Sequence, residues 1–118
     1  MPKTVIHVFR DDDESIVTGT RLARRIQEVA AENDVELEVF CFGPAQRRLA
    51  AEDASAAATT YRRQIAELIA AGVPVGACVN AARADGTEAE LLRRGLSLSV
   101  ARDEFARFTL EEATVITF

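Results

Sequence analysis

GVPVGACVNAARADG, at residues 72–86, combines a short apolar strand, a cysteine and the start of a helix. The strand runs directly into Cys78, Asn80 follows two residues later, and Asp85 and Gly86 close the short helical segment. In an open α/β sheet, ligands and chemistry gather at the carboxyl ends of strands, beside the amino ends of the helices that follow. The positive end of a helix macrodipole favours the thiolate form of a cysteine placed there. We therefore expect any chemical function of this protein to depend on the Cys78 thiol.

Strands and helices alternate along the whole chain on either side of this segment. Runs rich in Val, Ile and Leu predict strands at residues 4–9, 35–42, 73–78, 96–100 and 114–118. Apolar residues at helical spacing predict helices at about 13–32, 46–51, 61–71, 87–94 and 103–112. Residues 52–59 fit either a loop or the start of the next helix. Regular alternation of this kind predicts an α/β fold, with a parallel sheet covered on both faces and right-handed crossovers.

Capping residues, glycine and proline indicate where several of the expected helices and strands begin or end. Asp11 and Glu14 have the spacing of a capping box at the start of the first helix. The Gly43-Pro44 pair is expected to end the second strand, and Gly72 is a natural carboxyl-terminal cap for the helix before it.

Composition limits the classes of function. The chain has 118 residues, a formal net charge of -5 and 48% hydrophobic residues, so we expect one domain, spanning residues 1–118. Without a basic stripe, the acidic chain offers no surface for a nucleic-acid backbone. The amino terminus shows no charged leader with an apolar core, and no apolar run approaches the length of a membrane span. We therefore expect a cytoplasmic protein that binds neither membrane nor nucleic acid.

Missing residue types narrow the chemistry further. Lys3 is the only lysine and precedes the first strand, so Schiff-base chemistry and lysine-dependent phosphate loops lack a suitable residue. His7 is the only histidine, which excludes a site with several histidine ligands. The sequence contains no Gly-rich motif of the kind that binds phosphate or a dinucleotide. We expect no metal and no organic cofactor.

Five segments of the chain resemble the DsrE/DsrF-like family of sulfur-relay and related proteins. They are TVIHVF at 4–9, CFGPA at 41–45, GVPVGACVNAARADG at 72–86, GLSLSV at 95–100 and ATVITF at 113–118. The most specific part is the Cys78-Val79-Asn80 step, with Arg83, Ala84 and Gly86 downstream.

The resemblance carries expectations about fold and function. It implies a three-layer α/β/α domain with a five-stranded parallel sheet, flavodoxin-like in outline and assembled into homo-oligomers. It also implies that Cys78 receives a sulfane sulfur and donates it, so that a sulfur donor or acceptor protein is the expected partner. One departure lies beside Gly43, where Phe42 stands at a position that is histidine in many relatives.

Each expected site residue has a structural alternative. Cys78 is either a thiol exposed to a cleft or a small buried hydrophobe at the end of a core strand. Asn80 is expected to cap the following helix and to support the site by fixing it, and Gly43 is the other supporting residue. Cys41 ends the preceding strand as Cys78 ends its own, and is either a resolving thiol or part of the core.

Other titratable residues fit structural roles. His7 lies within the first strand and is expected to be a satisfied core histidine. Arginine pairs on expected helices are assigned to solvated faces, to pairs with glutamate or to a subunit interface; they are Arg24-Arg25, Arg47-Arg48, Arg62-Arg63 and Arg93-Arg94.

Three functional hypotheses remain at this point. The first is a sulfur-relay protein that carries a persulfide on Cys78, and the second is a non-catalytic homo-oligomeric module that binds a small molecule or a protein. The third is a thiol-disulfide switch between Cys41 and Cys78. The hypotheses predict different surroundings for the Cys78 sulfur.

Overall fold

Five parallel strands form the centre of the protein in a computed structural model that describes residues 1–118. The strands are β1 (Lys3–Val8), β2 (Glu36–Cys41), β3 (Val75–Cys78), β4 (Ser97–Ser99) and β5 (Thr114–Thr117). Their order in the sheet is β4-β3-β2-β1-β5, and every neighbouring pair is parallel. The five-stranded parallel sheet of the expected α/β fold is therefore confirmed.

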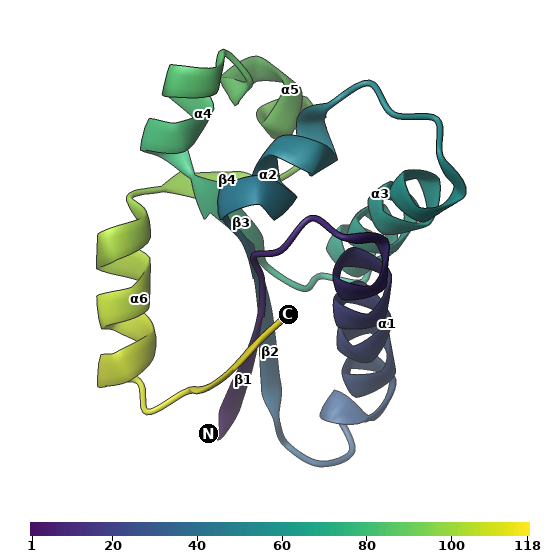
Figure 1. The fold of residues 1–118 in the computed structure, drawn as a ribbon. Helices are drawn as coiled ribbons and strands as arrows, with labels where there is room; N and C mark the ends of the chain where they lie inside the picture. Colours follow the sequence, from purple (N-terminus) through teal and green to yellow (C-terminus); the bar gives the residue numbers. More distant parts are fainter.

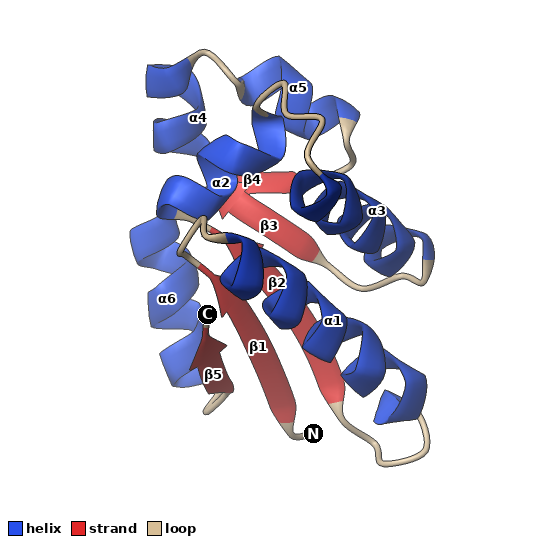
Figure 2. Cartoon of the chain, turned by 45° about the vertical axis from the view of Figure 1, so that its right-hand side comes forward, coloured by secondary structure: helices blue, strands red, loops and turns tan.

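Six helices surround the sheet. They are α1 (Asp13–Ala30), α2 (Gly43–Ala50), α3 (Ala56–Ala70), α4 (Val79–Asp85), α5 (Glu88–Arg93) and α6 (Ala101–Leu110). Figure 1 shows α1 and α3 on one face of the sheet and α6 on the other, while α2, α4 and α5 lie at the carboxyl ends of the strands. Figure 2 shows the strand arrows pointing toward these three short helices. We call the two sides of the sheet the α1/α3 face and the α6 face.

Two helix starts differ from the sequence expectation. Asp12 is the N-cap of α1 and accepts a hydrogen bond from the Ser15 amide at 3.1 Å, so the expected box of Asp11 and Glu14 was wrong by one residue. Helix α2 begins directly at Gly43 with Pro44 in its first turn, because proline fits a position where the amide needs no partner. The Gly-Pro pair therefore starts a helix as well as ending a strand.

The uncertain segment 52–59 divides between a loop and a helix. Ser55 is the N-cap of α3, and its hydroxyl accepts a hydrogen bond from the Ala58 amide at 3.2 Å. Asp53 in the loop accepts a hydrogen bond from the Ser55 amide at 2.8 Å, which orders the chain just before the helix. Helix α3 therefore starts five residues earlier than the apolar spacing from Tyr61 suggested.

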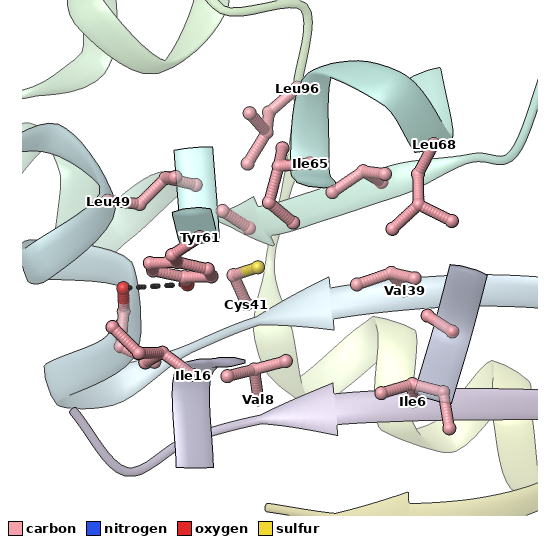
Figure 3. Packing of buried hydrophobic residues seen from close by; sticks show 14 of the residues in the cluster. Ile6, Val8, Ile16, Val39, Cys41, Leu49, Tyr61, Ile65, Leu68 and Leu96 are labelled. Carbon is pink, nitrogen blue, oxygen red and sulfur yellow. Dashed lines mark hydrogen bonds between the residues drawn. The ribbon is translucent and has the colours of Figure 1, made fainter. Parts of the chain in front are cut away.

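The core has two parts, one on each face of the sheet. The larger part, shown in Figure 3, lies on the α1/α3 face and includes Ile6, Val39, Cys41, Tyr61 and Leu68. The smaller part lies on the α6 face and consists of Val5, Phe40, Cys78, Ala101 and Phe108. Because successive side chains of a strand point to opposite faces, the register decides which core each residue joins. No helix is long and apolar enough to cross a membrane.

Candidate functional site

Cys78 lies where β3 ends and α4 begins, as the sequence predicts. It is the N-cap residue of α4, and its side chain makes no capping hydrogen bond. The residue is only 6% exposed, and it belongs to the apolar cluster on the α6 face together with Phe40 and Phe108. The thiol is thus at the expected edge of the sheet, in mainly apolar surroundings.

Gln46 fixes the backbone of Cys78 from the neighbouring helix α2. Its side-chain amide donates to the carbonyl oxygen of Cys78 at 2.9 Å and accepts from the amide of Cys78 at 3.0 Å. Gln46 is 1% exposed, so both hydrogen bonds are shielded from water. Sequence reasoning did not single out Gln46, because a glutamine in a short helix carries no signal that it reaches a strand 32 residues away.

Of the two supporting residues, Asn80 does not cap α4 as expected, and Gly43 shapes the turn before α2. Asn80 is exposed and lies inside the first turn of α4, since the N-cap position belongs to Cys78. Gly43 adopts a positive φ of 60°, and a Cβ atom there would meet the Phe9 ring at 2.5 Å. Gly43 is therefore required for the turn from β2 into α2, where the chain passes close to an aromatic ring.

Cys41 lies on the opposite face of the sheet from Cys78. In the register of β2 and β3, Cys41 is paired with Ala77, so the next residue, Cys78, points the other way. Cys41 is 0% exposed in the core of the α1/α3 face, and burial raises the pKa of its thiol to about 11. The structure does not bring the two thiols together, and Cys41 fits the core alternative (Figure 3).

A cavity of about 180 Å³ lies on the α6 face, and Cys78 is not among the residues that line it. Its walls include Gly76, two residues before Cys78 in the same strand, and Ser99, the register partner of Cys78 on β4. Ser97 pairs with Gly76 and also lines the cavity. These small side chains leave space between the sheet and α6.

Charged side chains close the other side of this cavity. Arg107 of α6 donates to both carboxylate oxygens of Glu38, at 2.8 and 2.9 Å, and Lys3 donates to Glu38 at 2.6 Å. Arg107 also pairs with Glu104 at 2.6 Å and with Glu111 at 2.9 Å. The hydrogen bond from Arg107 is the main reason why the pKa of Glu38 is lowered, and Lys3 adds to the effect. The network fixes α6 against the amino-terminal half of the sheet.

His7 lies on the α6 face in an aromatic environment. Its ring centroid is 4.9 Å from that of Phe105 and 5.8 Å from that of Phe9. Nδ1 lies 3.0 Å from the Thr117 hydroxyl, whereas Nε2 is buried without a hydrogen-bond partner. Burial lowers the pKa of His7. The core location is as expected, but the histidine is satisfied on one nitrogen only.

No group of three or more His, Cys, Asp or Glu side chains is arranged to hold a metal ion. The carboxyl end of β3 combines one thiol with a backbone held by Gln46, and the cavity lined in part by Gly76, Ser97 and Ser99 lies nearer the start of the strand.

Comparison with known proteins gives matches to one family model and to solved structures. The model of the DsrE/DsrF-like family matches residues 3–118. Three solved structures align over almost the whole chain, and two of them are described as proteins of unknown function. The one from Methanobacterium thermoautotrophicum is 25% identical with a TM-score of 0.73, and covers 100% of both chains. The one from Bacteroides thetaiotaomicron is 13% identical with a TM-score of 0.76, and covers 98% of this chain and 94% of the other.

The third structure is the ychN protein from E. coli, which is 23% identical with a TM-score of 0.74 and covers 100% of both chains. No curated protein matches this chain.

Proposed function

Because the chain belongs to the DsrE/DsrF-like family, matched over residues 3–118, we propose that it acts in sulfur relay, with Cys78 as the carrier of a sulfane sulfur. The observation that supports this proposal most is the position of Cys78 at the carboxyl end of β3 and the N-cap of α4. This is the region of a parallel sheet where reacting groups gather.

The contrast between the two cysteines also supports Cys78 as the carrier. Cys41 has no exposed surface, and its pKa is raised to about 11, so its thiol stays protonated near neutral pH. Cys78 keeps 6% exposure at the carboxyl end of β3. Of the two thiols, Cys78 is the one with some exposed surface.

The proposed loading step needs no metal or organic cofactor. The thiolate of Cys78 attacks the terminal sulfur of an inorganic polysulfide, the adjacent sulfur–sulfur bond breaks, and the shortened polysulfide leaves with the electron pair. Cys78 then carries a persulfide. In the discharge step, the thiolate of an acceptor attacks the outer sulfur of that persulfide, and the Cys78 thiolate is the leaving group.

A second candidate function is a non-catalytic module that binds a small molecule or a protein. The low exposure of Cys78, and its place in the apolar cluster with Phe40 and Phe108, favour this alternative. In such a module the thiol would contribute only to packing.

Self-association is part of both candidate functions. Strand β5 forms one edge of the sheet and has no neighbour beyond it, and Val115 and Ile116 on that strand are 39% and 37% exposed. An exposed edge with apolar side chains is a template for pairing with another chain. We take a second copy of this chain as its partner.

Intact mass spectrometry after incubation with inorganic polysulfide distinguishes the two candidate functions. We expect the folded wild-type protein and Cys41→Ser to gain the mass of sulfur, and Cys78→Ser to gain none. Protein unfolded in urea provides the control for intrinsic reactivity, because both thiols are then accessible. If folded wild-type protein takes up no more sulfur than Cys78→Ser, the relay proposal fails and the binding module is favoured.

A further inference from the structure

Three arginines surround two adjoining cavities on the side of the molecule away from α6. The cavities have volumes of about 330 and 450 Å³, and both are lined by Arg62, Glu90, Arg93 and Arg94. Their lining residues belong to α3, α5 and the connection between α2 and α3, elements that Figure 2 shows at its upper right. We call these three arginines and Glu90 the arginine cluster.

Positive charge exceeds negative charge within the arginine cluster. Arg94 pairs with one carboxylate oxygen of Glu90 at 2.8 Å, and Arg93 pairs with the other oxygen of the same carboxylate. Arg62 donates to the main-chain oxygen of Asp53, a neutral acceptor. Three guanidinium groups therefore share one carboxylate, which leaves an excess of two positive charges in the cluster.

Two guanidinium nitrogens of the cluster are buried without any hydrogen-bond partner. They are Nη1 of Arg62 and Nε of Arg94. Buried polar groups in proteins are nearly always paired, and an unpaired donor on a charged group is costly. Burial lowers the pKa of Arg94, and the positive charges of Arg62 and Arg93 add to this effect. An anion in the cavity that Arg62 and Arg94 line would offset the positive charge of both groups.

Nearby carboxylates do not supply that anion. Asp53 lines the outer cavity, but it pairs with Arg48 at 3.2 Å and accepts a hydrogen bond from the amide of Ser55 at 2.8 Å. Glu52 is an exposed residue on the wall of the same cavity. No carboxylate pairs with Arg62, and Glu52 and Asp53 line the outer cavity only, so the excess of positive charge applies to the inner cavity of about 330 Å³.

We propose that the arginine cluster binds a phosphoryl group, either as free phosphate or as the head of a small phosphomonoester. A dianion matches the excess of two positive charges, and the planar guanidinium fork suits the oxygens of a phosphate. A cavity of about 330 Å³ is also of the size that holds a small organic ligand, and Leu49 and Ile65 supply apolar wall beside the arginines.

Arg62 and Arg63 are neighbours on α3 but differ in their surroundings. Arg63 is exposed, and its Nε atom lies 3.8 Å from a carboxylate oxygen of Glu67, one turn later in the helix. This is the pairing with glutamate that the sequence predicts. Arg62, its neighbour in sequence, points to the side of α3 that lines the cavities. Arg63→Gln is therefore a matched control for Arg62→Gln, with the same charge change on the same helix.

Calorimetric titration with inorganic phosphate, and separately with phenyl phosphate, tests the proposal at an ionic strength held constant with chloride. We expect wild-type protein and Arg63→Gln to bind, and Arg62→Gln and Arg94→Gln each to lose about tenfold or more in affinity, as expected for a charge-assisted hydrogen bond. Tighter binding of phenyl phosphate would assign the site to a phosphomonoester, and equal binding would assign it to free phosphate. Glu52→Gln should bind more tightly, because a repulsive charge is removed from the wall.

NMR of the arginine Nε–H groups gives a second readout that needs no variant to fold. Phosphate should shift the Nε–H signal of Arg94 in the wild-type protein and leave that of Arg63 unchanged. The absence of binding by wild-type protein, or equal binding by Arg62→Gln and Arg63→Gln, would overturn the proposal. Cys78→Ser should bind phosphate normally, so failure of the sulfur-relay proposal and failure of this one are distinguishable.

Discussion

Glu38 links strand β2 to helix α6 through a charge that depends on pH. It accepts hydrogen bonds from Lys3 and Arg107, and the one from Arg107 is the main reason why its pKa is lowered. A carboxylate whose pKa is lower in the folded than in the unfolded state adds stability above its unfolded pKa, near 4.3. That contribution is lost as the pH falls through the lower, folded-state value.

We predict that Glu38→Gln lowers the free energy of unfolding by about 1–2 kcal/mol at pH 7. The difference from wild type should shrink as the pH is lowered below about 4, and urea unfolding at a series of pH values measures it. Glu36→Gln is the control, because Glu36 is half exposed and lies 3.8 Å from Lys3. An equal loss of stability at neutral and acidic pH would contradict this account.

At the residue scale, the sequence placed Cys78 correctly along the chain but could not determine its exposure. Its position follows from local signals, namely an apolar run, a cysteine and a helix start. Its burial depends on Phe108 of α6, a contact between residues distant in sequence. Whether Cys41 faces Cys78 depends on the pairing of Cys41 with Ala77, and no local pattern specifies that register.

Gln46 shows how one element positions another. Its side chain forms two hydrogen bonds to the backbone of Cys78, which connect α2 to the junction of β3 and α4. We predict that Gln46→Ala lowers the free energy of unfolding by about 3 kcal/mol, because it leaves a buried donor and a buried acceptor unpaired. Urea denaturation is the measurement.

The control for Gln46→Ala is Arg47→Ala, which changes the next, exposed residue of the same helix. A loss of stability no larger in Gln46→Ala than in Arg47→Ala would show that the two hydrogen bonds are not important to the fold.

At the element scale, most strands and helices could be predicted from periodicity, and the glycines that end α3 and α4 could be predicted too, whereas the amino-terminal caps of α1 and α4 could not. The predicted strand 35–42 and the observed β2 (Glu36–Cys41) differ by one residue at each end. The cap of α1 was assigned to Asp11 instead of Asp12, because three consecutive aspartates have the same capping chemistry. Only the backbone conformation at the helix start distinguishes between them.

At the scale of the whole molecule, β5 is an open edge of the sheet, and Val115 on this strand is exposed. Val115 points to the same face of the sheet as its register partner Val5. If this edge joins two copies, size-exclusion chromatography with light scattering should give a mass above that of one chain. We predict that Val115→Lys shifts the protein to the mass of a monomer, because a charge on an edge strand opposes pairing.

Val29→Lys is the matched control for that shift, since Val29 is 47% exposed on α1, away from the β5 edge. A monomeric wild type, or an unchanged mass in Val115→Lys, would show that the edge does not mediate self-association.

The opposite orientations of Cys41 and Cys78 have a consequence for any cargo held on Cys78. The sheet itself lies between the two sulfurs, so a persulfide on Cys78 has no second thiol of its own chain with which to react. Premature release of hydrogen sulfide through an internal disulfide is blocked by this separation. The lifetime of the loaded state would then be set by how often another molecule presents a thiol, and its discharge would follow the concentration of that molecule.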